Sequence, residues 1–66
     1  MQVSVNGEMK TLDNGTTVAE LLAQLGITGG RYAVEVDREI VPKAEHATTE
    51  LAEGSKVEIV TFVGGG

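Results

Sequence analysis

A single segment of the chain repeats its apolar residues with the period of an α-helix, and this limits the possible folds more than any other feature. The apolar positions fall at i, i+3, i+4 and i+7 and form one stripe. They are Val18, Leu21, Leu22 and Leu25. A helix this short is marginally stable in water by itself. We therefore expect the stripe to pack against a β-sheet built from the rest of the chain.

Both ends of this helix are marked by capping residues. Thr17 is followed three positions later by Glu20, the spacing of a capping box, in which each side chain accepts a hydrogen bond from the other residue's backbone amide. Gly26 follows the apolar stripe, where a left-handed residue commonly ends a helix. The sequence therefore predicts a helix that starts after Thr17 and stops before Gly26.

The chain before the helix has the pattern of a β-hairpin. Val3 and Val5 alternate with polar residues, as in a half-buried strand, and Asn6-Gly7 is a strong turn signal. A two-residue loop places charged side chains opposite the two valines. A three-residue loop that includes Glu8 keeps that face mostly apolar. We expect the longer loop, and a second strand over residues 9–12.

Three further strands are expected after the helix. Residues 32–36 alternate apolar and polar side chains, and residues 40–41 form a short strand that ends at Pro42, which cannot donate to a ladder. Residues 43–52 have no clear period and are expected to form a connection with one helical turn around Leu51. The last strand spans residues 56–63 and is apolar on both faces, which suits the centre of a sheet.

The order of the elements predicts the fold class. Two strands, one amphipathic helix and three strands favour an α+β domain, with a mixed sheet and the one main helix packed on one of its faces. This is the β-grasp arrangement. In it, the last strand lies in the middle of the sheet and runs parallel to the first.

Length and composition limit the number of domains and the kinds of partner. Sixty-six residues make one domain, which we assign to residues 1–63, followed by a flexible glycine tail at residues 64–66. Without cysteine, no disulfide or thiolate zinc site can stabilise the fold. The net charge of −5 and the scattered basic residues argue against nucleic-acid binding.

The sequence also contains no membrane or export signal. No apolar run approaches the roughly 18 residues of a membrane span. The first residues alternate like a strand and lack the basic start of a signal peptide. We therefore expect a cytoplasmic protein that does not interact with membranes.

No catalytic or metal site can be recognised in the body of the chain. His46 is the one histidine, with no second ring or thiol to complete a metal set or a triad, and we expect it in a surface loop. The carboxylates are dispersed, so no acid and base pair stands out. We therefore expect a protein that has no catalytic residue and no bound metal.

The glycine tail, Gly64, Gly65 and Gly66, is the remaining candidate. A frayed end or a leftover of cloning would give the same pattern. A glycine segment can, however, thread a narrow channel in another protein because it has no side chains. The carboxylate of Gly66 is then the only plausible reactive group of the chain.

Several segments together resemble the ThiS family, ubiquitin-like sulfur carriers of thiamine biosynthesis. They are Thr-Val-Ala-Glu-Leu-Leu at 17–22, Ile-Val-Pro at 40–42, Glu-Gly-Ser-Lys-Val-Glu-Ile at 53–59, and the Gly-Gly end. The Gly-Gly end alone is shared with ubiquitin and with MoaD, the small subunit of molybdopterin synthase. The whole set in this order, in so short a chain, favours ThiS.

The resemblance implies a carrier cycle on Gly66. A ThiF-type adenylating enzyme would convert the Gly66 carboxylate into an acyl-adenylate with ATP. Sulfur from a cysteine desulfurase would then give a thiocarboxylate, which the thiazole synthase ThiG would consume. The carrier would bind no cofactor, and these two species would be transient modifications. Alternatives are a MoaD-like carrier for molybdopterin, a ubiquitin-like modifier of lysines, and a β-grasp binding module without C-terminal chemistry.

The last strand also suggests where partners bind. If Val57 and Ile59 face the helix, Val60 and Phe62 lie on the other side of the sheet, which no element covers. We expect Val60 and Phe62 to form an apolar patch that docks on ThiF and ThiG. The alternative is that a local bulge turns Phe62 into the core.

Overall fold

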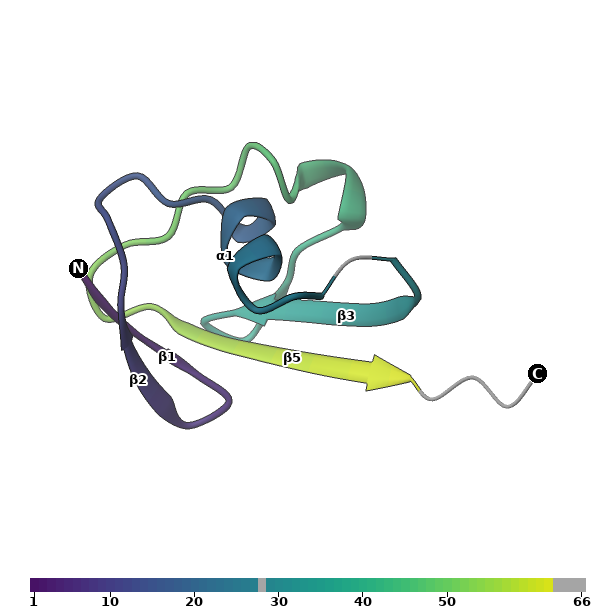
Figure 1. Ribbon diagram of the computed structural model, residues 1–66, viewed down its shortest axis with the longest axis horizontal. Helices are drawn as coiled ribbons and strands as arrows, with labels where there is room; N and C mark the ends of the chain where they lie inside the picture. The colour runs from purple at the N-terminus through teal and green to yellow at the C-terminus, as the bar shows by residue number, and fades with distance from the viewer. Residues whose placement is uncertain (28, 63–66) are drawn as a thin grey trace.

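The computed structural model describes residues 1–27 and 29–62 and contains one sheet with one main helix (Figure 1). The elements are β1 (Gln2–Val5), β2 (Glu8–Thr11), α1 (Val18–Gln24), β3 (Arg31–Val36), β4 (Glu39–Ile40), the 3-10 helix η1 (Lys43–Glu45) and β5 (Lys56–Phe62). The strand order is β2-β1-β5-β3-β4, with β1 parallel to β5 and the other neighbours antiparallel. The expected α+β arrangement with the last strand in the centre is confirmed.

Helix α1 has the caps that the sequence predicts. The Thr17 amide donates to the Glu20 carboxylate at 2.9 Å, and the Glu20 amide donates to the Thr17 hydroxyl at 3.1 Å. Gly26 has a φ of 76°, and the amide of Ile27 reaches back to the carbonyl of Leu22 at 2.9 Å. This bond and the left-handed glycine form a Schellman ending. Both helix ends are therefore determined by local sequence.

The hairpin between β1 and β2 has a two-residue loop, so the expected three-residue loop is wrong. Val5 pairs with Glu8, and Asn6 and Gly7 have φ values of 49° and 85°, the left-handed pair of a type I′ turn. β2 is an edge strand that packs mainly on β1, so its helix-side residues do not need to be apolar. Glu8 is exposed there and Lys10 is half-buried. The second strand accordingly starts at Glu8 and ends one residue before Leu12.

The core lies between α1 and one face of the sheet. It includes the helix stripe and alternate residues of the inner strands, and Figure 1 shows the helix lying across that face. Its buried members are Val3, Val5, Leu12, Val18, Leu21, Leu22, Val34, Val41, Leu51, Val57 and Ile59. No helix in the described residues is long and apolar enough to cross a membrane.

The connection from β4 to β5 differs from the prediction. Its helical turn is η1, directly after Pro42, and not a turn around Leu51. Leu51 is instead a core residue, and its amide donates to the carbonyl of Thr16 at 2.9 Å. The segment is therefore pinned beside the start of α1 and closes the core on that side.

Candidate functional site

The predicted docking residues lie on the solvent side of β5. Val57 is fully buried and Ile59 is 8% exposed, whereas Val60 and Phe62 are 51% and 55% exposed. Residues 57–62 pair with residues 31–36 of β3 in an unbroken register. No bulge turns Phe62 inward, so the core alternative for Phe62 is wrong. The outward position predicted for Val60 and Phe62 is confirmed.

The other exposed apolar side chains lie on the same side of the sheet, which we call the open face. Residues directly opposite each other in a ladder share one face. Met9 pairs with Ser4 of β1 and Ile40 pairs with Glu35 of β3, both on the side away from α1. Met9 is 64% exposed and Ile40 is 72% exposed. In the described part of the chain, every large apolar residue that is exposed therefore lies on the open face.

The polar residues of the open face give it a gradient of charge along β5. Glu58 lies opposite Glu35, Val60 lies opposite the half-buried Ala33, and Phe62 lies opposite Arg31. The end of β5 that precedes the glycine tail therefore carries a cation next to an aromatic ring. The two carboxylates lie at the other end of the apolar patch.

Asn6, in the turn after β1, holds β5 in place through hydrogen bonds to its backbone. The amide of Ile59 donates to Asn6 Oδ1 at 2.7 Å, and Asn6 Nδ2 donates to the carbonyl of Ile59 at 3.1 Å. The backbone amide of Asn6 also donates to the carbonyl of Val57 at 2.9 Å. The side chain thus continues the parallel ladder by one step after β1 has ended. Sequence reasoning identified Asn6 as a turn residue and missed this second role.

The predicted reactive group lies beyond the end of β5. Gly64, Gly65 and Gly66 lie outside the described residues, as does Val63. Their roles therefore stay predictions, and the nearest described landmark is Phe62 at the end of β5.

His46 is not the surface residue that the sequence suggested, because it is only 6% exposed. Its Nε2 lies 3.0 Å from the carbonyl of Val41, and its ring stacks on Tyr32 with centroids 5.8 Å apart. η1 turns the chain so that this side chain points under α1, and the carbonyl of His46 accepts from the amide of Ala19 at 2.9 Å. Pro42 directly precedes η1, but no pattern in the surrounding sequence signals that His46 is buried.

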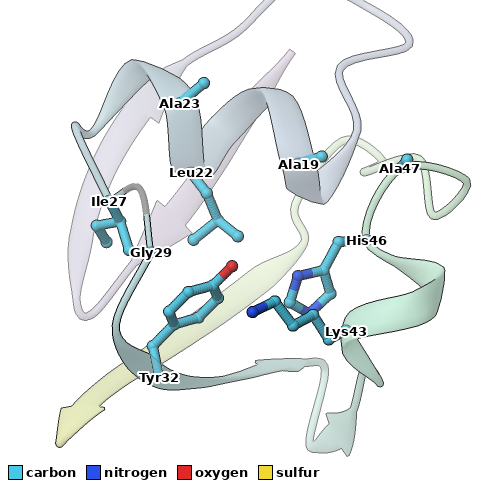
Figure 2. Close-up of a pocket in the computed structure, with 9 residues that line it drawn as sticks. All are labelled: Ala19, Leu22, Ala23, Ile27, Gly29, Tyr32, Lys43, His46 and Ala47. Atoms are coloured by element: carbon cyan, nitrogen blue, oxygen red, sulfur yellow. The ribbon is translucent and has the colours of Figure 1, made fainter.

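A pocket of about 310 Å³ lies between α1 and β3 beside this histidine (Figure 2). Three of the residues that line it, Ala19, Leu22 and Ala23, come from the helix, and the others come from the segments that follow it. Lys43 Nζ lies 5.7 Å from the centre of the Tyr32 ring. Within residues 1–27 and 29–62, no three His, Cys, Asp or Glu side chains gather as metal ligands would. His46 is held by a backbone carbonyl and a neighbouring ring, which is a packing role.

Comparisons with known proteins agree with this architecture. Residues 3–66 match the ThiS family. The chain is 42% identical over 66 residues to a thiazole synthase of Paramagnetospirillum magneticum, covering all of this chain but 20% of that protein. It is also 34% identical over 65 residues to the sulfur carrier protein ThiS of Bacillus subtilis, covering 97% of this chain and 98% of that one.

A solved structure shows the same fold at full length. The thiamine biosynthesis protein ThiS of Geobacter metallireducens superposes with a TM-score of 0.83 at 32% identity, and the match covers 100% of both chains. The chain spans only a fifth of the thiazole synthases of Paramagnetospirillum magneticum and Magnetococcus marinus. Because the family match extends over nearly the whole sequence and the β-grasp fold agrees with it, the chain belongs to the ThiS family.

Proposed function

We propose that this chain is a sulfur carrier in thiamine biosynthesis, loaded and unloaded on the carboxylate of Gly66. The observation that carries the proposal is the family match over residues 3–66, which includes the glycine tail. It is supported by the Bacillus subtilis relative, a protein of nearly the same length that bears the name sulfur carrier.

The chemistry follows from the reactivity of a carboxylate. A carboxylate is a poor electrophile, so a ThiF-type enzyme transfers AMP from ATP to the Gly66 oxygen and releases pyrophosphate. A cysteine desulfurase supplies a persulfide, whose terminal sulfur attacks the acyl carbon and displaces AMP. A thiol then reduces the resulting disulfide and leaves the thiocarboxylate. The carrier contributes the acyl group, and its partners contribute every catalytic residue and the nucleotide.

The open face gives these partners a surface to bind. Val60 and Phe62 lie on the strand that leads to the tail, so an enzyme that buries them also receives Gly66 nearby. Exposed apolar patches of this kind commonly mark protein interfaces. Thiazole synthase is the expected acceptor, since two relatives with that name contain a region similar to this chain.

Intact mass spectrometry tests the proposal. The chain is incubated with ATP, a ThiF-type enzyme, a cysteine desulfurase, cysteine and a reducing thiol. Replacement of one oxygen by sulfur should raise the mass by about 16 Da, the result expected when sulfur displaces an activated leaving group. A chain with one alanine added after Gly66 is the control and should stay unmodified. If the native chain also stays unmodified while its C-terminus is shown to be Gly66, the carrier function is wrong.

A further inference from the structure

The backbone of β5 directs its polar groups alternately to its two neighbours. The carbonyl of Val57 accepts from the amide of Asn6 on the β1 side. The carbonyl of Lys56 accepts from the amide of Asp37, which follows β3, at 2.8 Å. Because strand residues alternate, the odd-numbered residues of β5 direct their amide and carbonyl groups toward β1. The even-numbered residues direct theirs toward β3.

The β1 side of β5 loses its partner strand halfway along. β1 ends at Val5 opposite Val57, and the Asn6 side chain then bonds to both polar groups of Ile59. After Gly7 the chain turns back into β2. Figure 1 shows β5 running on past the β1–β2 hairpin. The parallel ladder therefore stops at Ile59, although β5 continues for three more residues.

Thr61 is the residue left at this open edge. It is exposed and lies opposite Tyr32 in the antiparallel ladder with β3. By the alternation above, this pair exchanges no hydrogen bonds across the ladder. The amide and carbonyl of Thr61 therefore point to the side that β1 has vacated. In the part of the chain that the structure describes, no strand lies there to pair with them.

We propose that the backbone of Thr61 is a docking site for an extended segment of the adenylating enzyme, which adds to the sheet beside β5. An unpaired strand edge is a ready template for pairing with another chain. This inference rests on the proposed function and names the contact by which the partner aligns the tail. Such pairing is made by backbone hydrogen bonds. It therefore fixes the direction and register of the enzyme segment relative to β5 without requiring a particular side chain.

The position of Thr61, close to the glycine tail, favours the adenylating enzyme as the partner that binds there. Val60 and Phe62, the neighbours of Thr61, present their side chains on the open face, so one partner covers the patch and the edge together. Gly66 lies five residues after Thr61, a span of at most about 17 Å in an extended chain. Backbone pairing at Thr61 therefore limits the distance between the Gly66 carboxylate and the ATP bound by the enzyme.

Proline at position 61 tests whether the enzyme pairs with the open edge of β5, because it removes no hydrogen bond between β5 and β3. Thr61→Pro deletes an amide hydrogen that faces the open side, and proline is tolerated in strands at such positions. We expect Kd for a ThiF-type enzyme, measured by isothermal titration calorimetry, to rise at least about 10-fold, because a hydrogen bond is lost and the ring blocks the edge. Thr61→Val keeps the amide and the branched shape and should bind like the native chain.

A second variant covers the case in which Thr61→Pro disturbs the strand. A backbone ester at position 61, made by semisynthesis, removes only the amide donor and should weaken binding about 3- to 10-fold. Native-like circular dichroism and melting are required of each variant that is compared. Val60→Pro is the contrasting variant. Unlike Thr61→Pro, it removes a hydrogen bond to β3 and should lower the stability of the fold.

Two results would overturn the edge proposal while the carrier function stands. One is that the proline and ester variants both bind as tightly as the native chain and are adenylated as fast. The other is that the native chain forms dimers that Thr61→Pro abolishes with enzyme binding unchanged, which would make a second copy the occupant. Failure of the native chain itself to gain sulfur is a separate result, and it would count against the proposed function.

Discussion

The two halves of β5 have opposite surroundings although they belong to one strand. Residues 56–59, the inner half, lie between β3 and the β1 side, and their helix-side members Val57 and Ile59 are buried. Residues 60–62, the outer half, pair with β3 alone, and Val60 and Phe62 are exposed. The inner half therefore contributes to the core, and the outer half leaves its apolar side chains exposed.

This difference separates stability from binding along a single strand. Burial of apolar area stabilises the fold where the helix covers the sheet. The same kinds of side chain have no partner within the described residues where the sheet is open. Substitutions in the inner half should therefore affect unfolding, and substitutions in the outer half should affect complex formation.

Ile59→Ala should produce the largest effect. Truncating a buried isoleucine removes apolar contacts and leaves a cavity, with a typical cost of about 2–5 kcal/mol. Ile59 is 8% exposed, and a domain this small has little stability in reserve. Urea unfolding followed by circular dichroism measures the loss. An unfolding free energy within about 0.5 kcal/mol of the native value would show that the inner half is not part of the core.

Asn6→Ala should have the next largest effect, because Asn6 joins the hairpin to the inner half. The change removes the two side-chain hydrogen bonds to Ile59 and places alanine at a φ of 49°. We expect a loss of about 1–3 kcal/mol. Asn6→Gly is the matched control, because glycine adopts this φ without strain but also lacks the bonds.

The two Asn6 variants divide the cost between backbone strain and hydrogen bonding. Asn6→Gly should recover part of the stability, and the amide of Ile59 should still exchange faster with solvent than in the native protein. Equal stability of Asn6→Gly and the native chain, with unchanged exchange at Ile59, would show that the side-chain bonds contribute nothing.

Phe62→Ala should weaken binding and leave the fold intact. Phe62 is 55% exposed, so its truncation should change the unfolding free energy by less than about 0.5 kcal/mol. If the aromatic ring anchors the interface, Kd for a ThiF-type enzyme should rise at least about 10-fold. Calorimetry measures both quantities on the same samples. A large fall in melting temperature with unchanged binding would assign Phe62 to the core.

Local signals explain which parts of the fold could be predicted. The caps of α1 depend on Thr17, Glu20 and Gly26, which lie within one short segment, so their pattern alone determined the helix ends. The alternation of β5 likewise placed Val60 and Phe62 outside the core. These features require no knowledge of distant contacts.

Errors arose where a residue's environment depends on the rest of the sheet. The hairpin loop was expected to be longer because charged residues opposite Val3 and Val5 seemed costly, yet β2 is an edge strand and tolerates them. His46 sits in a segment without any period, and its burial follows from η1 placing it against Tyr32. The role proposed for Gly66 depends on the family resemblance, because a glycine tail has no side chains that could signal chemistry.

Glu58→Gln should produce the smallest effect and a gain in stability. Glu58 lies opposite Glu35 at the boundary between the two halves of β5, and like charges directly across a ladder repel. Removing one charge should stabilise the fold by no more than about 0.5 kcal/mol, because both side chains reach solvent. Glu39→Gln is the control, since it removes the same charge from the protein but lies opposite Val36.

Salt distinguishes this repulsion from the general effect of a lower net charge. Near 1 M NaCl the screening length falls to about 3 Å, so the advantage of Glu58→Gln over Glu39→Gln should disappear. Denaturant unfolding at low and high salt measures the difference. If the two variants gain equally at low salt, the pair across β3 and β5 is not repulsive.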